Sequence, residues 1–408
     1  MIDPPSDRDP PGPASRPLRL LLLSPAAEMP GGVAEYVGMI LHCLSPAVVG
    51  ERFAIGRRPG EGGHSPWRML RDYLRFAVRL LGRDRPDVLH VNPTLDRNAL
   101  PRDALFLVLA RLRRPRAVIV TFHGWRQGTE RRLLSPGPTG AVLRLGMRLA
   151  LRGADRVQVL AEPYRQALLK LGLEAERVAT TSTMFDGRLF GGRLPDDRLS
   201  DDRLSDDRLS DGEAPAGPGR EAGPRRRILF LSRFVAGKGG AELIEAFGVL
   251  HAAFPEFRLT MAGDGPLAAE WRQLAAASPA RAAIDFPGYV SGAAKARLLQ
   301  DALLFVLPSA TEGMPVSLLE AMAAGAAALV TPVGGIPLVV RPGQTGAFLE
   351  TADAAGIAAA LRDMLASPGL VEGMGRAAAE LAWQHYESAQ VVARLERLYL
   401  ETAAARRR

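Results

Sequence analysis

Two glutamates stand eight positions apart in the stretch TEGMPVSLLEAMAAG, residues 311–325. Glu312 lies in a turn-like sequence beside Gly313 and Pro315, whereas Glu320 falls within an Ala/Leu/Met run that is typical of a helix. A carboxylate among apolar residues is costly to bury unless hydrogen-bond donors reach it. Sugar hydroxyls are such donors, so the pair could hold a ribose and a hexose on the two sides of a diphosphate. The alternative is a helix N-cap together with a structural salt bridge.

Two cations follow another apolar run. In SRFVAGKGG, Arg233 comes directly after a strand-like segment, and Lys238 stands five residues later at the start of a helical pattern. Free backbone N–H groups at a helix N-terminus, together with a lysine and an arginine, form a site suited to a diphosphate. Either cation alone would be an ordinary solvent-exposed residue. The pair leaves two interpretations open, a diphosphate site and two unrelated surface residues.

Glycines and a histidine follow two further apolar runs. Gly31 and Gly32 precede a helical pattern, where a phosphate could approach the backbone closely. His123 follows AVIVTF and precedes Gly124, so it is a candidate hydrogen-bonding or acid–base residue. Each signal is weak alone, because paired glycines are often only a turn and a single histidine is often structural.

Short apolar runs alternate with helical patterns on both sides of a central interruption. Runs at 18–24, 87–93, 117–122 and 156–160 read as strands in the first half. Runs at 226–234, 257–263 and 303–309 do so in the second. Strands that alternate with helices predict parallel sheets covered on both faces. The expected fold class is therefore α/β, with two doubly wound Rossmann-like domains and a cleft between them.

The interruption is a five-residue repeat, RLPDDRLSDDRLSDDRLSDG, at 193–212. Its period matches neither a helix nor a strand, and a Pro/Gly-rich stretch follows it, so we expect a flexible linker in the connection between the two domains. The predicted segments are a disordered tail at 1–17, a Rossmann-like N-terminal domain at 18–186, the linker at 187–226, a Rossmann-like C-terminal domain at 227–385, and a C-terminal helix at 386–408 that packs back toward the first domain.

Composition narrows the class of protein. The chain has 408 residues, a net charge of +8 and one cysteine, Cys43, which excludes an intramolecular disulfide and fits a reducing compartment. No apolar stretch reaches the length of a membrane span, and the acidic, Pro-rich start does not resemble a signal peptide. We expect a cytoplasmic protein. The basic charge suits nucleic acid, but no basic motif with interleaved aromatic residues supports that partner.

One basic segment suggests a membrane contact. In WRMLRDYLRFAVRLLGR, residues 67–83, arginines recur at helical spacing and Trp67, Leu70, Leu74 and Val78 lie on another face. Such an amphipathic helix can lie on an anionic membrane surface. The alternative is an ordinary helix that packs on the N-terminal sheet.

The order of several motifs identifies a family. SRFVAGKGG, AGDGPL, FPGYV, FVLPS, EGMPVSLLEAMAAG, VGGIP and GQTGAFL occur in that order through the second half, and PGGVAEYV and TFHG match more loosely in the first. Together they resemble the family-4 glycosyltransferases, the group 1 enzymes of the GT-B fold. Ala326 stands where a proline is common in the family, which affects the entry to a strand.

The resemblance implies roles for the residues above. Arg233 and Lys238 would neutralise the donor diphosphate, Glu320 would hold the ribose, and Glu312 would hold the hydroxyls of the donor sugar. His123 would contact that sugar near the anomeric centre. The further donor-binding positions are Gly31, Gly32, Tyr289, Val290, Gly313, Met314 and Pro315.

The resemblance also implies a reaction. The family retains anomeric configuration and uses neither a divalent metal nor a cofactor beyond the nucleotide-sugar donor. The domain at 18–186 would bind the acceptor, and the domain at 227–385 would bind the nucleotide-sugar. The acceptor would be a glycan or a lipid-linked molecule, as in bacterial polysaccharide or glycoconjugate synthesis. A nucleotide-sugar epimerase of the same fold and a non-catalytic nucleotide-sugar-binding member of a polysaccharide-assembly complex are the alternatives.

Overall fold

The structure is a computed structural model, and it describes residues 16–29, 31–56, 58, 60–61, 65–82, 84–95, 99–111, 114–125, 127–191 and 225–405. All but the last two residues of the predicted tail at 1–17 lie outside the described residues. The five-residue repeat at 193–212 also lies outside them.

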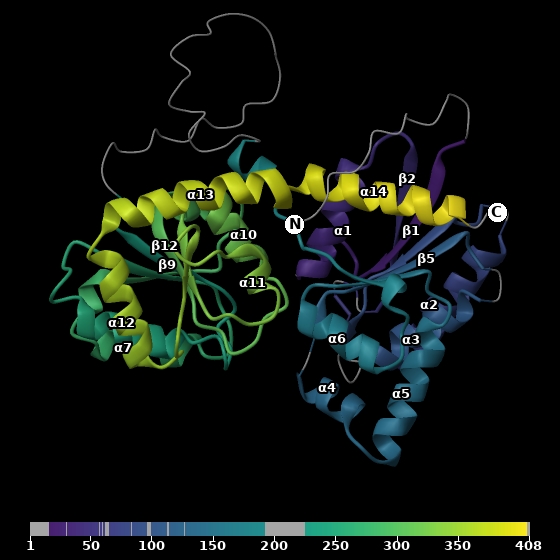
Figure 1. Cartoon of the computed structure of the whole chain (residues 1–408), viewed down its shortest axis with the longest axis horizontal. Helices are drawn as coiled ribbons and strands as arrows, with labels where there is room; N and C mark the ends of the chain where they lie inside the picture. Colours follow the sequence, from purple (N-terminus) through teal and green to yellow (C-terminus); the bar gives the residue numbers. More distant parts are fainter. Residues whose placement is uncertain are drawn as a thin grey trace, which may run out of the picture.

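Six parallel strands form the N-terminal sheet in the order β2-β1-β3-β5-β7-β8 (Figure 1). β3 and β5 are buried along their whole length, which explains why their sequences are nearly continuous apolar runs. A two-stranded sheet of β4 and β6 lies beyond the ends of these strands. The strands are β1 (Leu18–Ser24), β2 (Val48–Ala54), β3 (Val88–Val91), β4 (Thr94–Leu95), β5 (Ala117–Phe122), β6 (Gly124–Trp125), β7 (Arg156–Val159) and β8 (Val178–Thr180).

A second sheet of six parallel strands has the order β11-β10-β9-β12-β13-β14. The strand order reverses between β9 and β12, and in doubly wound folds ligands bind at the carboxyl ends of the strands at such a point. The predicted α/β class with two doubly wound sheets is confirmed. The strands are β9 (Arg227–Leu231), β10 (Arg258–Ala262), β11 (Ile284–Gly288), β12 (Ala302–Leu307), β13 (Ala327–Val330) and β14 (Gly346–Phe348).

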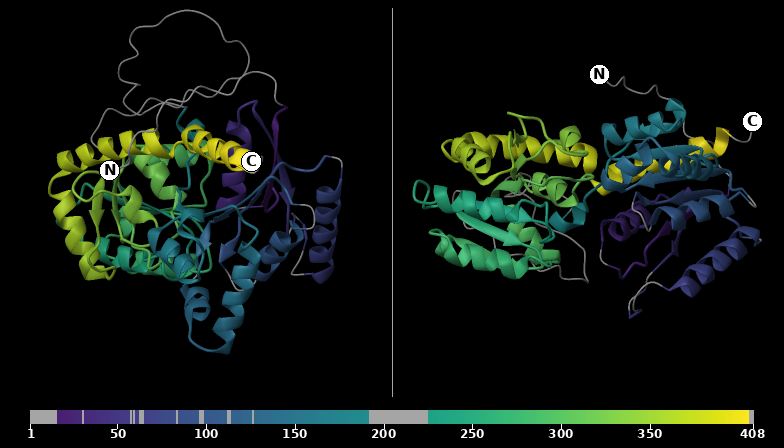
Figure 2. Two further views of the ribbon diagram at one scale, coloured as in Figure 1. Left: turned by 45° about the vertical axis from the view of Figure 1, so that its right-hand side comes forward. Right: turned by 90° about the horizontal axis from the view of Figure 1, so that it is seen from below.

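Helices cover both faces of each sheet (Figure 2). On the N-terminal sheet, α1 and α14 bury one set of core side chains and α2 to α6 bury another. The helices are α1 (Gly32–Cys43), α2 (Pro66–Leu81), α3 (Ala99–Leu109), α4 (Gln127–Leu134), α5 (Pro138–Leu151), α6 (Glu162–Lys170), α7 (Gly240–Leu250), α8 (Ala268–Ala277), α9 (Gly292–Asp301), α10 (Val316–Ala323), α11 (Ile336–Val339), α12 (Ala354–Leu365), α13 (Pro368–Tyr386) and α14 (Ser388–Ala405), with short 3₁₀ turns η1 (Ala175–Arg177), η2 (Gly187–Phe190) and η4 (Arg281–Ala283).

The last two helices run along both halves of the molecule (Figure 1). α13 packs on the C-terminal sheet, the chain turns at Glu387, and α14 packs against α1 of the N-terminal half. The Tyr399 hydroxyl lies 2.7 Å from Nδ1 of buried His90, and Nε2 of His90 lies 2.8 Å from the Thr121 hydroxyl. Thr121 donates to Gln158, so His90 donates to Thr121 and accepts from Tyr399. This directional chain of hydrogen bonds fixes α14 on the N-terminal sheet.

The chain crosses between the halves before the repeat. Phe185 exchanges backbone hydrogen bonds with Tyr386 and Ser388, and Phe185 and Phe190 are both buried in the C-terminal core. Residues 187–190, which the sequence assigned to the linker, form η2. The expected linker at 187–226 therefore begins too early, because residues 187–190 pack on the C-terminal core, and the repeat itself lies outside the described residues. Both ends of the chain from 191 to 225 belong to the C-terminal half, because the rings of Phe185 and Phe190 pack on Trp383 there.

Candidate active site

An ion pair joins the loops that follow β9 and β12, where the strand order reverses. Nζ of Lys238 lies 2.5 Å from Oε1 of Glu312, whose side chain is only 9% exposed. The two loops approach closely because Gly239 has φ +75°, and a Cβ atom there would come within 2.5 Å of Pro308. The Ala310 amide also donates to the Gly237 carbonyl at 2.8 Å. The structure thus brings two of the predicted site residues into direct contact.

A second ion pair holds the other glutamate. Glu320 lies buried on α10, and its Oε1 accepts a hydrogen bond from Nζ of Lys295 on α9 at 2.6 Å. Its Oε2 is buried and has no hydrogen-bond partner among the described residues. Burial raises the pKa of Glu320, and the neighbouring Lys295 opposes that rise. A buried acceptor without a donor is what a ligand hydroxyl would satisfy.

Lys295 is the functional candidate that the sequence interpretation missed. The chain contains only three lysines, at 170, 238 and 295, and two of them pair with the two glutamates of the motif. The scarcity of lysine was the available signal. Scarcity alone does not give Lys295 a role, because nothing in the spacing links residue 295 to residue 320.

Arg233 lies at the same edge of the sheet and is exposed. It follows β9 in a turn in which the Val235 amide donates to its carbonyl at 3.0 Å. Within the part of the chain that the structure describes, its guanidinium makes no ion pair with Glu312 or Glu320. It therefore offers a cation to solvent, while Lys238 is already paired.

His123 occupies the carboxyl end of β5 in the N-terminal half. Its Nε2 lies 2.9 Å from Oδ1 of Asn92, and Nδ2 of Asn92 donates to the Leu23 carbonyl at 3.2 Å. A carbonyl only accepts, so Asn92 presents its oxygen to the ring and Nε2 must carry the proton. Burial lowers the pKa of His123 to about 4, so the ring is neutral at physiological pH. Asn92, which the sequence interpretation did not single out, sets the tautomer.

The two halves of the molecule meet around Glu312 and Gly313. The Tyr164 hydroxyl on α6 donates to the Glu312 carbonyl at 2.6 Å. A Cβ atom on Gly313 would lie 3.0 Å from the His123 carbonyl, and the Gly335 amide donates to the Gly313 carbonyl at 2.6 Å. The loop that carries the first glutamate is thus fixed between both halves, beside the predicted histidine.

Two of the other residues predicted to bind the donor follow Gly313 directly, and four lie elsewhere in the chain. Met314 is buried in the C-terminal core and Pro315 is the N-cap residue of α10. Gly31 has φ +145° at the start of α1, and both Gly31 and Gly32 border open space. The Tyr289 side chain is exposed, and Val290 packs partly on the core. Their predicted roles in donor binding remain predictions.

Both halves of the chain match sequence models of known protein families. The sequence model described as "Glycosyl transferases group 1" matches residues 218–381, and the one described as "Glycosyl transferase 4-like domain" matches residues 31–183. The chain belongs to the group 1 glycosyltransferases. The resemblance inferred from the ordered motifs is confirmed, and the first match includes Arg233, Lys238, Lys295 and both glutamates of this group 1 glycosyltransferase.

Individual relatives match over part of their length. N-acetyl-alpha-D-glucosaminyl L-malate synthase of Bacillus anthracis is 29% identical over 174 residues, 43% of this chain and 45% of that protein. Glycogen synthase of Mycobacterium tuberculosis is 31% identical over 173 residues, 42% of each chain. The chain thus spans less than half the length of these relatives. Across nearly the whole chain, HepE of Anabaena in complex with UDP has the same fold, with a TM-score of 0.66, 16% identity, and coverage of 94% of this chain and 100% of that one.

The described residues contain neither a metal-ligand cluster nor a single membrane-spanning helix. Among the described residues, no three His, Cys, Asp or Glu side chains gather as metal ligands would. Within the same residues no single helix is both long and apolar enough to cross a membrane, although α12 and α13, bent by 95° at their junction, reach that length and composition together.

Proposed function

We propose that this group 1 glycosyltransferase is a retaining enzyme that moves a sugar from a nucleotide-sugar donor to a glycan or lipid-linked acceptor. The observation that carries the proposal is the pair of glutamates, each held by a lysine, at the reversal of strand order and beside His123. Glycogen synthase, a relative by sequence, makes a polysaccharide by its name. This similarity supports a role for the present enzyme in bacterial polysaccharide or glycoconjugate synthesis.

The donor would bind with its diphosphate at the cations. Arg233 is exposed at this edge, and Lys238 can interact with the diphosphate while it remains close to Glu312. Charge-assisted hydrogen bonds from two cations stabilise a departing diphosphate most strongly where water is excluded. We propose that these cations replace a divalent metal ion.

The two glutamates would hold the two sugars of the donor. Oε2 of Glu320 is buried and unpaired among the described residues, so it can accept from a ribose hydroxyl. Glu312 would accept from the donor sugar, and neutral His123 would offer a polar edge near the anomeric carbon. Tyr289 and Val290 would border the base, and Gly31 and Gly32 would approach the phosphate from the N-terminal half.

The reaction would proceed on one face of the sugar. The bond between the anomeric carbon and the diphosphate oxygen breaks, and the acceptor oxygen bonds to the same face of that carbon. The acceptor proton passes to the departing diphosphate, which leaves as the nucleoside diphosphate. Such a front-face displacement needs no side-chain nucleophile.

We also propose a cytoplasmic enzyme in peripheral contact with the inner face of an anionic membrane. The single cysteine supports a reducing compartment. A lipid-linked acceptor would be reached at the membrane surface.

The test is a panel of UDP-, GDP-, ADP- and dTDP-sugars incubated with the purified chain, with nucleotide release as the signal. We expect one preferred donor, unchanged release in EDTA, and loss of release but not of nucleotide binding in Glu312→Gln. Glu380→Gln, an exposed glutamate on α13, is the matched control and should behave as the wild type. With an acceptor added to the preferred donor, NMR of the glycoside product would show inversion of configuration if the retaining mechanism is wrong. Nucleotide binding without release by the wild type would favour the non-catalytic alternative.

A further inference from the structure

Helix α2 presents an apolar stripe to solvent. Its buried side chains, Asp72, Phe76 and Leu80, recur every four residues and pack on the N-terminal sheet. At 100° per residue, a second stripe falls on the opposite side of the helix. Its members are between 46% and 78% exposed: Trp67, Leu70, Leu74, Val78 and Leu81. The helix therefore packs on the sheet through one stripe and leaves an equally apolar stripe uncovered.

Two neighbouring helices also carry exposed apolar side chains. α3 packs against both α2 and α5. On α3 and α5, five large apolar side chains are between 40% and 70% exposed: Leu105, Val108, Val142, Leu145 and Leu149. Exposed apolar side chains on three helices packed in succession are a candidate interaction surface.

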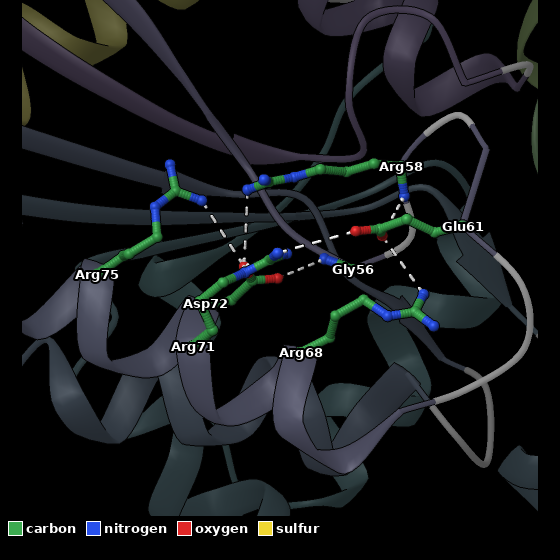
Figure 3. A network of polar contacts seen from close by, with 7 residues as sticks. All are labelled: Gly56, Arg58, Glu61, Arg68, Arg71, Asp72 and Arg75. Atoms are coloured by element: carbon green, nitrogen blue, oxygen red, sulfur yellow. Dashed lines mark hydrogen bonds and ion pairs between the residues drawn. The ribbon is translucent and has the colours of Figure 1, made fainter.

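Arginines gather around Asp72 and Glu61 (Figure 3), and at 100° per residue Arg71 and Arg75 fall beside the stripe on α2. Around buried Asp72, the guanidinium groups of Arg71, Arg75 and Arg58 lie at 3.3, 3.7 and 3.8 Å from Oδ1. Glu61 accepts from Arg68 at 3.4 Å. The network of Figure 3 therefore holds four arginines against two carboxylates.

The surplus charge is directed toward solvent. The side chains of Arg71 and Arg75 remain partly exposed although they reach the buried carboxylate of Asp72. A guanidinium has five N–H donors, so one that shares a carboxylate with two other cations can still bind a phosphate. The network thus positions phosphate-binding groups beside the apolar stripe.

We propose that the outward face of α2, extended by α3 and α5, docks on an anionic lipid bilayer. The apolar stripe enters the interface between headgroups and acyl chains, and Arg71 and Arg75 bind lipid phosphates. An apolar stripe that begins with an exposed tryptophan and is flanked by arginines has the chemistry of an interfacial helix. The surplus positive charge favours binding to an anionic membrane over a neutral one. The inference rests on the proposed function in one respect: the docking would bring a lipid-linked acceptor within reach of the active site.

The experiment is co-sedimentation of the full chain with phosphatidylcholine vesicles, with and without phosphatidylglycerol. We expect binding to the anionic vesicles that weakens with salt, and a loss of roughly tenfold in Leu74→Ser/Val78→Ser. The matched control is Val249→Ser/Leu370→Ser, two side chains that are equally exposed on the C-terminal half. Both variants change only exposed residues, so thermal unfolding should match that of the wild type.

Two results would overturn the proposal. One is binding to anionic vesicles that is equal in the stripe variant and the control. The other is no vesicle binding together with self-association that the stripe variant abolishes, which would assign the surface to a second copy of the chain. The assay contains no donor or acceptor, so its failure is distinct from failure of the transferase reaction, which uses a water-soluble donor and no vesicles.

Discussion

The ion pair between Lys295 and Glu320 allows a sharp prediction. Replacing Lys295 with methionine keeps most of the side-chain volume and removes the cation from a carboxylate that is otherwise buried. Burial already raises the pKa of Glu320, and Glu35 and Asp186 add to that rise. Without the lysine nothing opposes the shift, so the pKa of Glu320 should rise further.

The size of the effect depends on pH. A buried charge that loses its partner costs about 3–5 kcal/mol. Glu320 can avoid part of that cost by taking up a proton, at about 1.4 kcal/mol for each pH unit above its ordinary pKa. We expect Lys295→Met to lose about 3–4 kcal/mol of stability at pH 7.5 and about 1 kcal/mol at pH 5. The loss grows with pH because the folded state, whose Glu320 has the raised pKa, then binds more protons than the unfolded state.

Chemical denaturation at several pH values measures this directly. The matched control is Arg297→Met, which removes an exposed cation from the same helix and should change stability little. The KM for the donor should also rise in Lys295→Met, because a protonated Glu320 is a poorer acceptor for a ribose hydroxyl. Equal stability of the two variants at pH 7.5, or a loss that does not vary with pH, would refute this account of the pair.

Two further substitutions test the packing that positions the site. Tyr399→Phe should cost about 1–3 kcal/mol, because it leaves Nδ1 of His90 buried without its donor; a melting temperature equal to that of the wild type would contradict the hydrogen-bond chain. Gly239→Ala and Gly343→Ala both place alanine at a φ near +75°, but only the former meets another loop, the one after β12. The melting temperature should therefore fall further in Gly239→Ala than in Gly343→Ala, and only Gly239→Ala should raise the KM for the donor.

The sequence predicts the fold well because buried parallel strands have a distinctive composition. The run at β12 is apolar throughout and that at β5 contains one polar residue, Thr121, and both are buried at every position. β2 was not predicted, since VVGERFA mixes charged residues into an edge strand that is exposed at two positions. Edge strands carry a weaker signal because only part of each strand is buried.

The candidate site was predictable only in part. Strand-end position singled out Lys238, Glu312 and His123, and the structure brings them to one region. Lys295 and Asn92 were not predicted, because their partners are distant in sequence and depend on how elements pack. For α2, the spacing predicted two different faces, but only the packed structure shows that the apolar stripe is exposed rather than buried.

The place where the chain crosses between the two halves has a consequence for the evolution of this protein. The crossing is complete at Phe185 and Phe190, and both ends of the repeat-bearing segment are attached to the same half. Gain or loss of repeat units therefore changes only the length of chain between residues 191 and 225. Lengthening a chain between two fixed points costs only about 0.6 kcal/mol per doubling. The number of repeat units can therefore change while the crossing between the two halves at Phe185 and Phe190 stays the same.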